Sequence, residues 1–71
     1  MSIKGKVVLY NSVKGFGFIR YTTKDGTKDI YTHHSQFIGC KKLNIGQCVK
    51  FEIGENEHGP IARSVEPLFG R

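Results

Sequence analysis

The feature of this chain that most limits its fold is a series of short segments rich in β-branched and aromatic residues, separated by glycines and other turn formers. Segments of this composition favour β-strands. We expect five of them, over Ile3–Asn11, Phe16–Thr22, Lys28–His33, Gln47–Ile53 and Ile61–Val65, the last with a possible extension to Leu68. No window of a dozen residues shows the apolar spacing of an amphipathic helix, so the chain is predicted to be all-β.

A length of 71 residues allows one domain at most, so we expect a single domain over residues 1–71. Asp25-Gly26 is a strong signal for a hairpin between the second and third strands. Five short strands leave no room for a second sheet, and closing them into a barrel removes the exposed sheet edges. The prediction is an all-β, five-stranded antiparallel barrel, with one helical turn capped by the Ser35 hydroxyl in the loop after the third strand.

Charge is the first indication of a partner. The formal net charge is +5, from 11 Lys and Arg against 6 Asp and Glu. Such a balance indicates a polyanion, usually nucleic acid, although a lysine-rich surface also serves solubility. No stretch approaches the roughly 18 apolar residues of a membrane span, and the N-terminus has no signal-peptide core. We therefore expect a cytoplasmic protein without a membrane partner.

The octamer KGFGFIRY, Lys14 to Tyr21, fits the RNA-recognition signature at every position except one, where Ile19 stands for Val. The fold that usually carries this signature is a four-stranded sheet backed by two helices. This chain has no helix of useful length before or after the octamer. We therefore expect the octamer on a barrel strand, with Tyr21 outside the binding surface.

Strand periodicity then separates two faces, because residues two apart share a face. If Ile19 and Ile30 point into the barrel, the opposite face carries an outward patch made of Phe16, Phe18, Tyr31 and His33. Nucleobases would stack on such a patch at about 1–3 kcal/mol per base. The reverse assignment would expose both isoleucines and bury Asp29, so the outward assignment is favoured. Gly15 and Gly17 would then leave room for an approaching nucleic-acid strand.

Metal binding and catalysis are not expected. The spacings of Cys40 and Cys48 relative to the three histidines match no zinc pattern, and the cysteines are expected to pack in the interior. His33 and His34 are neighbours on a strand, so they should point to opposite faces and share no task. We expect no enzyme activity, no cofactor and no metal.

Five segments together resemble the cold-shock domain family over nearly the whole chain. KGFGFI is similar to its first ribonucleoprotein motif, and DIYTHHS to its second, D-V-F-V-H-F-S. GKVVLYN is similar to G-x-V-K-W-F-N, LNIGQCVKFEI to L-x-E-G-Q-x-V-x-F, and HGPIARSV to K/R-G-P-Q-A-x-N-V. The resemblance implies an oligonucleotide-binding (OB-fold) barrel that binds single-stranded RNA and DNA. It also implies an RNA chaperone or a regulator of transcription or translation, monomeric and without a small-molecule substrate.

The resemblance also implies a binding site. The positions that match stacking and contact residues are Tyr10, Lys14, Phe16, Phe18, Tyr31 and His33. Those that match residues packing on bases or hydrogen-bonding to them are Asn11, Asp29, His58, Gly59 and Pro60. The remaining predicted contacts are Lys6, His34, Lys41 and Lys42.

At three of the contact positions that the resemblance implies, this chain has a residue of different chemistry from that of the family. The family Trp is Leu9, the Lys before it is Val8, and the last Phe of the second motif is His34. Losing or softening two stacks predicts binding that is weaker by up to a few kcal/mol. Lys41 and Lys42 would offset part of this loss electrostatically. The alternative is a barrel whose altered patch contacts a protein partner.

Overall fold

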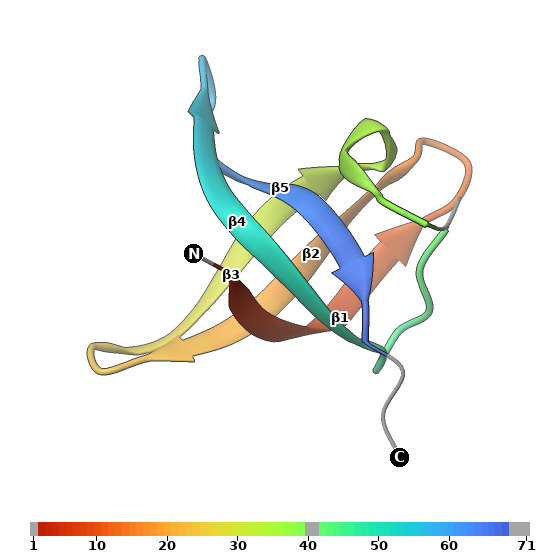
Figure 1. Ribbon diagram of the computed structural model, residues 1–71. Coiled ribbons are helices and arrows are strands. Elements are labelled where there is room, and N and C mark those ends of the chain that lie inside the picture. Colours follow the sequence, from red (N-terminus) through yellow and green to blue (C-terminus); the bar gives the residue numbers. More distant parts are fainter. Residues whose placement is uncertain (1, 40–41, 69–71) are drawn as a thin grey trace.

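The computed structural model describes residues 2–39 and 42–68 and shows a closed barrel of β-strands (Figure 1). Its strands are β1 (Ile3–Asn11), β2 (Phe16–Thr23), β3 (Gly26–His33), β4 (Cys48–Asn56) and β5 (Gly59–Pro67). All five predicted strands are present, and β1 has the predicted bounds. The β2–β3 and β4–β5 hairpins run further than expected, because their pairing continues to Gly26 and Gly59 at the turns.

The order of the strands around the barrel is β1-β2-β3-β5-β4. Four of the neighbouring pairs are antiparallel, but β3 and β5 are parallel and meet at Tyr31 and Ile61. The prediction of a wholly antiparallel barrel is therefore wrong at this seam. The reason is parity: in a closed ring of five strands, strand direction cannot alternate all the way round, so at least one pair must be parallel.

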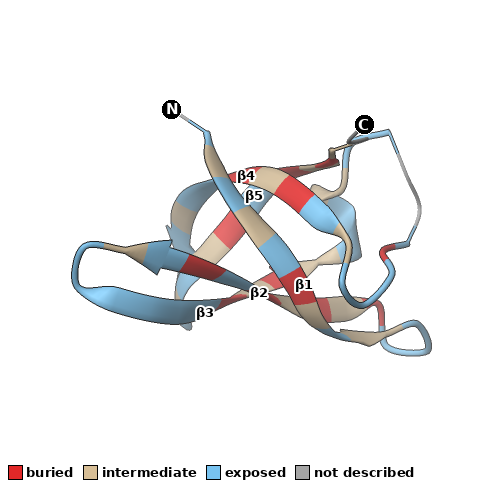
Figure 2. Ribbon diagram, turned by 90° about the horizontal axis from the view of Figure 1, so that it is seen from below, coloured by how far each residue is buried: buried red, intermediate tan, exposed pale blue. Residues whose placement is uncertain are grey.

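The interior is filled by side chains that alternate along the strands with exposed ones (Figure 2). The buried hydrophobic cluster consists of Val7, Ile19, Tyr21, Ile30, Leu43, Val49, Phe51, Ala62 and Val65. Ile19 and Ile30 are 0% and 3% exposed, which confirms the predicted inward face. Tyr21 packs edge-on against Phe51, with ring centroids 5.5 Å apart, so it belongs to the core and not to the outer surface.

A bulge in β1 decides which residues this strand presents outside. Val7 pairs with Ile19, but the next pair is Leu9 with Phe18, so the register shifts at Val8. Strict alternation would place Val7 and Leu9 on the same face, whereas the extra residue of a bulge reverses the faces beyond it. Val7 is buried and Leu9 is 45% exposed. The bulge therefore turns Leu9 outward beside Phe18.

The turn η1 (His34–Gln36) follows β3 and confirms the predicted helical turn. Its cap differs from the prediction. The capping residue is His33, whose imidazole Nδ1 accepts a hydrogen bond from the backbone N–H of Ser35 at 3.3 Å. His33 is the last residue of β3, so its ring is held at the end of the barrel face that carries the aromatic residues.

A second bulge, in β5, predicts a stabilising substitution. The register of β4 and β5 shifts between Lys50 and Glu52, and Ser64 has φ +54°. A left-handed conformation costs an L-residue roughly 1–2 kcal/mol, and asparagine tolerates it better than serine. We expect Ser64→Asn to raise the free energy of unfolding by about 0.5–1 kcal/mol in urea denaturation, and Ser64→Val to lower it. Equal stabilities for the three proteins would contradict this account of the bulge.

Candidate nucleic-acid interface

Three cross-strand pairs form rows on the outer surface of β2 and β3. The pairs are Phe16 with His33, Phe18 with Tyr31, and Arg20 with Asp29. The members of each pair lie opposite one another, and alternation places all six side chains on the face away from the buried isoleucines. Two adjacent strands of one hairpin thus build a continuous outward surface.

The centre of this surface is an aromatic triad of Phe16, Phe18 and Tyr31. Phe16 and Tyr31 are stacked with ring centroids 5.8 Å apart, and Phe18 meets Tyr31 edge-on at 5.8 Å. The two phenylalanine rings are 6.3 Å apart and also edge-on. All three residues are half-buried, because each ring shields part of its neighbours. The predicted outward direction of these rings is confirmed, and the triad offers ring surface on which bases could stack.

β1 adds Leu9 to this surface but not Tyr10. Leu9 lies directly opposite Phe18 in the β1–β2 ladder and extends the apolar area at its edge. Tyr10 instead packs against the core cluster, and its ring is 6.1 Å from that of Phe37. The structure therefore separates Tyr10 from the triad with which it was grouped, because the β1 bulge turns it toward the interior.

The third row is an ion pair that links β2 to β3 beside the triad. Arg20 Nε donates to Asp29 Oδ1 at 2.9 Å, and its Nη2 lies 3.4 Å from Oδ2. The hydrogen bond from Arg20 lowers the pKa of Asp29, and the same bond raises the pKa of Arg20. Both carboxylate oxygens of Asp29 are thus engaged by a cation, which competes with the predicted contact to base amines.

Sequence reasoning missed Arg20 as a member of the surface. The signal was available, because Arg20 stands two residues after Phe18 and Asp29 stands two before Tyr31. In a hairpin with a two-residue turn, these two positions are forced to be opposite.

The turn between β1 and β2 places Lys14. Asn11 Oδ1 accepts hydrogen bonds from the backbone N–H groups of Val13 and Lys14, each at 3.0 Å. This bonding holds the turn closed and leaves the Lys14 side chain exposed at the Phe16 end of the triad. Asn11 thus orders the turn through its oxygen, and its amide nitrogen is the group left for the predicted contact with a base.

Gly15 and Gly17 serve contacts inside the protein. A Cβ on Gly17 would lie 2.7 Å from the carbonyl oxygen of Leu9, and a Cβ on Gly15 would collide with the ring of His34. Gly15 also has φ +74°, which favours glycine. Both glycines are buried, so the expectation that they clear a path for an incoming strand is wrong. They let β1 and the His34 ring approach β2.

The two adjacent histidines meet instead of pointing to opposite faces. Their ring centroids are 4.2 Å apart. The expectation of opposite faces fails because β3 ends at His33, and His34 already belongs to η1. His34 donates its backbone N–H to the carbonyl of Gly15 at 2.8 Å, which ties η1 to the β1–β2 turn.

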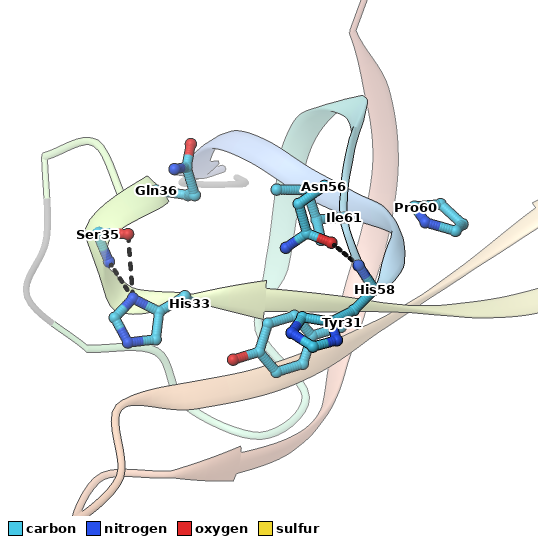
Figure 3. Close-up of a pocket in the computed structure, with 8 residues that line it drawn as sticks. All are labelled: Tyr31, His33, Ser35, Gln36, Asn56, His58, Pro60 and Ile61. Atoms are coloured by element: carbon cyan, nitrogen blue, oxygen red, sulfur yellow. Dashed lines mark hydrogen bonds between the residues drawn. The ribbon is translucent and has the colours of Figure 1, made fainter.

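A groove of about 500 Å³ lies beside this pair, between the end of β3 and the β4–β5 turn (Figure 3). Its lining residues are Tyr31, His33, Ser35, Gln36, Asn56, His58, Pro60 and Ile61. His58 and Pro60 were predicted site residues, and the structure brings them to the same groove as His33. Gly59, with φ +116°, lies between them as the first residue of β5. The polar groups of Ser35, Gln36 and Asn56 were missed, because only the parallel β3–β5 seam brings them together.

The predicted lysines are distributed around the barrel. Lys6 is exposed and lies opposite Arg20 in the β1–β2 ladder. With Lys4 and Arg20 it lines a second groove of about 390 Å³. Lys42 is exposed in the segment before β4, and Lys41 lies outside the described residues. Lys6 therefore extends the row of Arg20 and Asp29 toward β1.

Two further features concern metals and membranes. Within residues 2–39 and 42–68, no group of three or more His, Cys, Asp or Glu side chains is placed to hold a metal ion. Cys48 is exposed, so the expectation that it packs in the interior is wrong, and Cys40 lies outside the described residues. In the same part of the chain, no helix has the length and apolar character needed to cross a bilayer.

A small barrel with outward aromatic rings and exposed lysines around them is typical of one class of oligonucleotide-binding proteins. The family model described as the 'Cold-shock' DNA-binding domain matches residues 3–68. The chain is 51% identical to cold shock-like protein CspE of Buchnera aphidicola from Acyrthosiphon pisum (strain APS). It is 49% identical to cold shock-like protein CspC of Escherichia coli K12. Each similarity extends over 68 residues, 93% of this chain and 96% of the relative.

The chain belongs to the cold-shock domain family. Membership makes it a nucleic-acid-binding protein and not an enzyme. The predicted barrel and the predicted class of function are thereby confirmed, while the contacts of individual residues with bases stay predictions.

Proposed function

We propose that this protein binds single-stranded RNA and DNA by stacking bases on the aromatic triad, as a monomeric single cold-shock domain in the cytoplasm. Bound strands are held open, so the folding equilibrium of RNA shifts toward unpaired forms without ATP. In the cell this activity is that of an RNA chaperone or of a regulator of transcription or translation. The observation that carries the proposal is the triad itself: three mutually contacting rings on the outside of a basic barrel.

Cations on both sides of the triad support a path for the phosphate backbone. Lys14 stands beside Phe16, while Lys4 and Lys6 lie at the other end of the surface, next to the ion pair of Arg20 with Asp29. A single-stranded nucleic acid lying along the three rows would pass from the cation at one end to those at the other. Phosphate contacts of this kind make affinity fall steeply as salt rises.

A fluorescence titration tests this proposal. Tyrosine emission is followed while heptathymidine is added at low and at moderate salt, because the chain has no tryptophan. We expect saturable binding that weakens with salt. Absence of binding at low salt and high micromolar concentration would contradict the proposal and favour a protein partner for the same patch.

The outward position of Leu9 predicts a gain in affinity for Leu9→Trp. Leu9 is 45% exposed and lies opposite Phe18, so an indole there would extend the stacking surface without entering the core. One added stack is worth about 1–3 kcal/mol, which is roughly 5- to 150-fold in Kd. The measurement is a titration of both proteins with heptathymidine in the same buffer.

The matched control is Ile53→Trp, which adds an indole at another half-exposed site, on β4. It is expected to leave the affinity within twofold. Equal gains for both substitutions would show that the indole acts nonspecifically and that Leu9 is not part of the binding surface.

A further inference from the structure

One row of side chains runs across four strands of the barrel, next to the aromatic triad. Strand pairing places Cys48 of β4 opposite Lys6 of β1, Lys6 opposite Arg20 of β2, and Arg20 opposite Asp29 of β3. Lys4 stands two residues before Lys6 on β1, so it lies on the same face. Cations thus gather at this end of the surface, and its acidic member is engaged by Arg20.

The ion pair fixes the orientation of the Arg20 guanidinium. Arg20 Nε donates to Asp29 Oδ1 at 2.9 Å, and Nη2 lies 3.4 Å from Oδ2. A guanidinium is planar and carries five N–H donors in a fixed fork. Because Nε–H and one Nη2–H face Asp29, a second pair of parallel N–H groups, one on Nη1 and one on Nη2, points away from it. The Arg20 side chain is 55% exposed, so this outer donor pair is open to a ligand.

The second groove, of about 390 Å³, adjoins Arg20 and is called the cationic groove below. Lys4, Lys6 and Arg20 line it together with Leu68, whose backbone N–H donates to the carbonyl of Cys48 at 2.9 Å. Its volume is in the range of small-molecule sites, and one nucleobase fits within it. Arg20 comes two residues after Phe18, which is about 7 Å further along β2. A base next to those stacked on the triad would therefore reach the groove.

Two parallel donors select a base that presents two neighbouring acceptors. Guanine does so with O6 and N7, which are the usual bidentate partners of arginine. Adenine has a donor, the N6 amine, beside its N7, and thymine has a methyl group beside its O4. Cytosine offers N3 beside O2 in a single strand, but its one ring gives less apolar surface to Leu68 than the two rings of guanine. The chemistry of the cationic groove therefore favours guanine.

We propose that the cationic groove holds one guanine of the bound strand, with the outer donor pair of Arg20 on its O6 and N7. Asp29 is the positioning residue that holds the guanidinium, and Lys4 and Lys6 contact the neighbouring phosphates. The inference rests on the proposed function of the triad and adds a base preference to it. Stacking tolerates any base, and phosphate contacts carry no sequence information, whereas the Arg20 contact discriminates between bases.

The test compares heptamers of thymidine that carry one guanine, or one adenine, at each position in turn. At one position, or at two neighbouring positions, we expect the Kd with guanine to be at least about fivefold lower than with adenine, the low end of a bidentate arginine contact. At the other positions the two should bind alike. A cytosine series is measured in the same way, and a gain with cytosine but not with guanine would overturn the assignment.

Base analogues at the preferred position locate the contact on the guanine. 7-Deazaguanine lacks N7, so its affinity should fall toward that of adenine. Hypoxanthine keeps O6 and N7 and lacks only the 2-amine, so it should bind like guanine. The opposite result would place the contact on N1 and the 2-amine, which are donors that Asp29 accepts and Arg20 cannot, and it would overturn the role of Arg20.

Variants assign the preference to the ion pair. Arg20→Lys keeps the charge but replaces the fork with a single ammonium group, so the preference for guanine over adenine should fall below about twofold. Asp29→Asn should reduce the preference too, because its amide holds the guanidinium less firmly than a carboxylate. Full preference in Arg20→Lys would overturn the proposal, and full preference in Asp29→Asn would overturn the positioning role.

The matched control is Lys6→Gln, which removes the cation opposite Arg20 and leaves the fork in place. It should weaken all heptamers alike and keep the preference for guanine, and loss of the preference would show that charge alone produces it. Exposed ion pairs add little stability, so circular dichroism should show a folded barrel for all three variants.

The two levels of the account fail differently. If heptamers with guanine, adenine and thymine bind equally well at every position, the guanine site is refuted and the triad stands. If none of the heptamers binds at low salt, the proposed function of the triad is refuted as well.

Discussion

Replacing Phe16 and Phe18 together by alanine is expected to weaken binding of heptathymidine by at least about 30-fold while the barrel stays folded. Both rings are half-buried on the outside, and they contact each other and Tyr31. Two lost stacks at about 1–3 kcal/mol each correspond to roughly 2–6 kcal/mol. The measurement is the Kd by tyrosine fluorescence, with circular dichroism to verify the fold.

The matched control is Ile45→Ala, which removes an apolar side chain that is 68% exposed in the segment before β4. It should leave the affinity unchanged, because Ile45 lies outside the three rows of β2 and β3. Loss of the fold in the double phenylalanine variant would show that these rings support the core and that the triad is not a free surface.

The neighbouring residue on the same strand should behave in the opposite way. We expect Ile19→Ala to lower the free energy of unfolding by about 2–5 kcal/mol, because Ile19 is 0% exposed and lies in the core cluster. A domain of 71 residues has little stability to lose, so much of the variant should be unfolded at 37 °C. Urea and thermal denaturation followed by circular dichroism measure this loss.

Measurements of binding distinguish Ile19→Ala further from the double phenylalanine variant. At low temperature and with enough protein folded, Ile19→Ala should bind heptathymidine with an affinity near that of the parent protein, once corrected for the folded fraction. A variant that is fully stable, or one that is stable and does not bind, would mean that Ile19 faces outward and that the assignment of faces is inverted.

The faces of β2 and β3 could be predicted from the sequence because they depend on a period of two and on one short turn. Once Ile19 and Ile30 are placed inside, Phe16 and Tyr31 must be outside, and the hairpin makes them neighbours. The same reasoning reaches Arg20 if it is extended by two residues. Where strand pairing is regular, the period of two and the turn length are enough to predict the face on which a side chain lies.

The parts that residue spacing could not predict depend on irregular backbone or on distant contacts. The bulge at Val8 reverses the outer part of β1, so Tyr10 faces the core side instead of the triad. The end of β3 at His33 lets two adjacent imidazoles touch. The role of Gly17 depends on the Leu9 carbonyl of another strand. None of these follows from residue types at fixed spacing.

The parallel seam is a different case, since it is a matter of topology. Five strands in a closed ring require at least one parallel pair, and this could have been deduced once a closed barrel was predicted. In the structure the pair is β3 and β5. That seam also brings the β4–β5 turn to the end of β3, and so builds the histidine-lined groove.

The central claim is that single strands bind on the three rows of β2 and β3, and amide NMR during titration with heptathymidine tests it most directly. The account predicts that the largest shift changes occur at Phe16, Phe18, Tyr31 and His33, with Leu9 and Arg20 next. Amides of the opposite side, such as Glu52 on β4, should change little. Shifts centred on β4, with the triad unaffected, would contradict the claim.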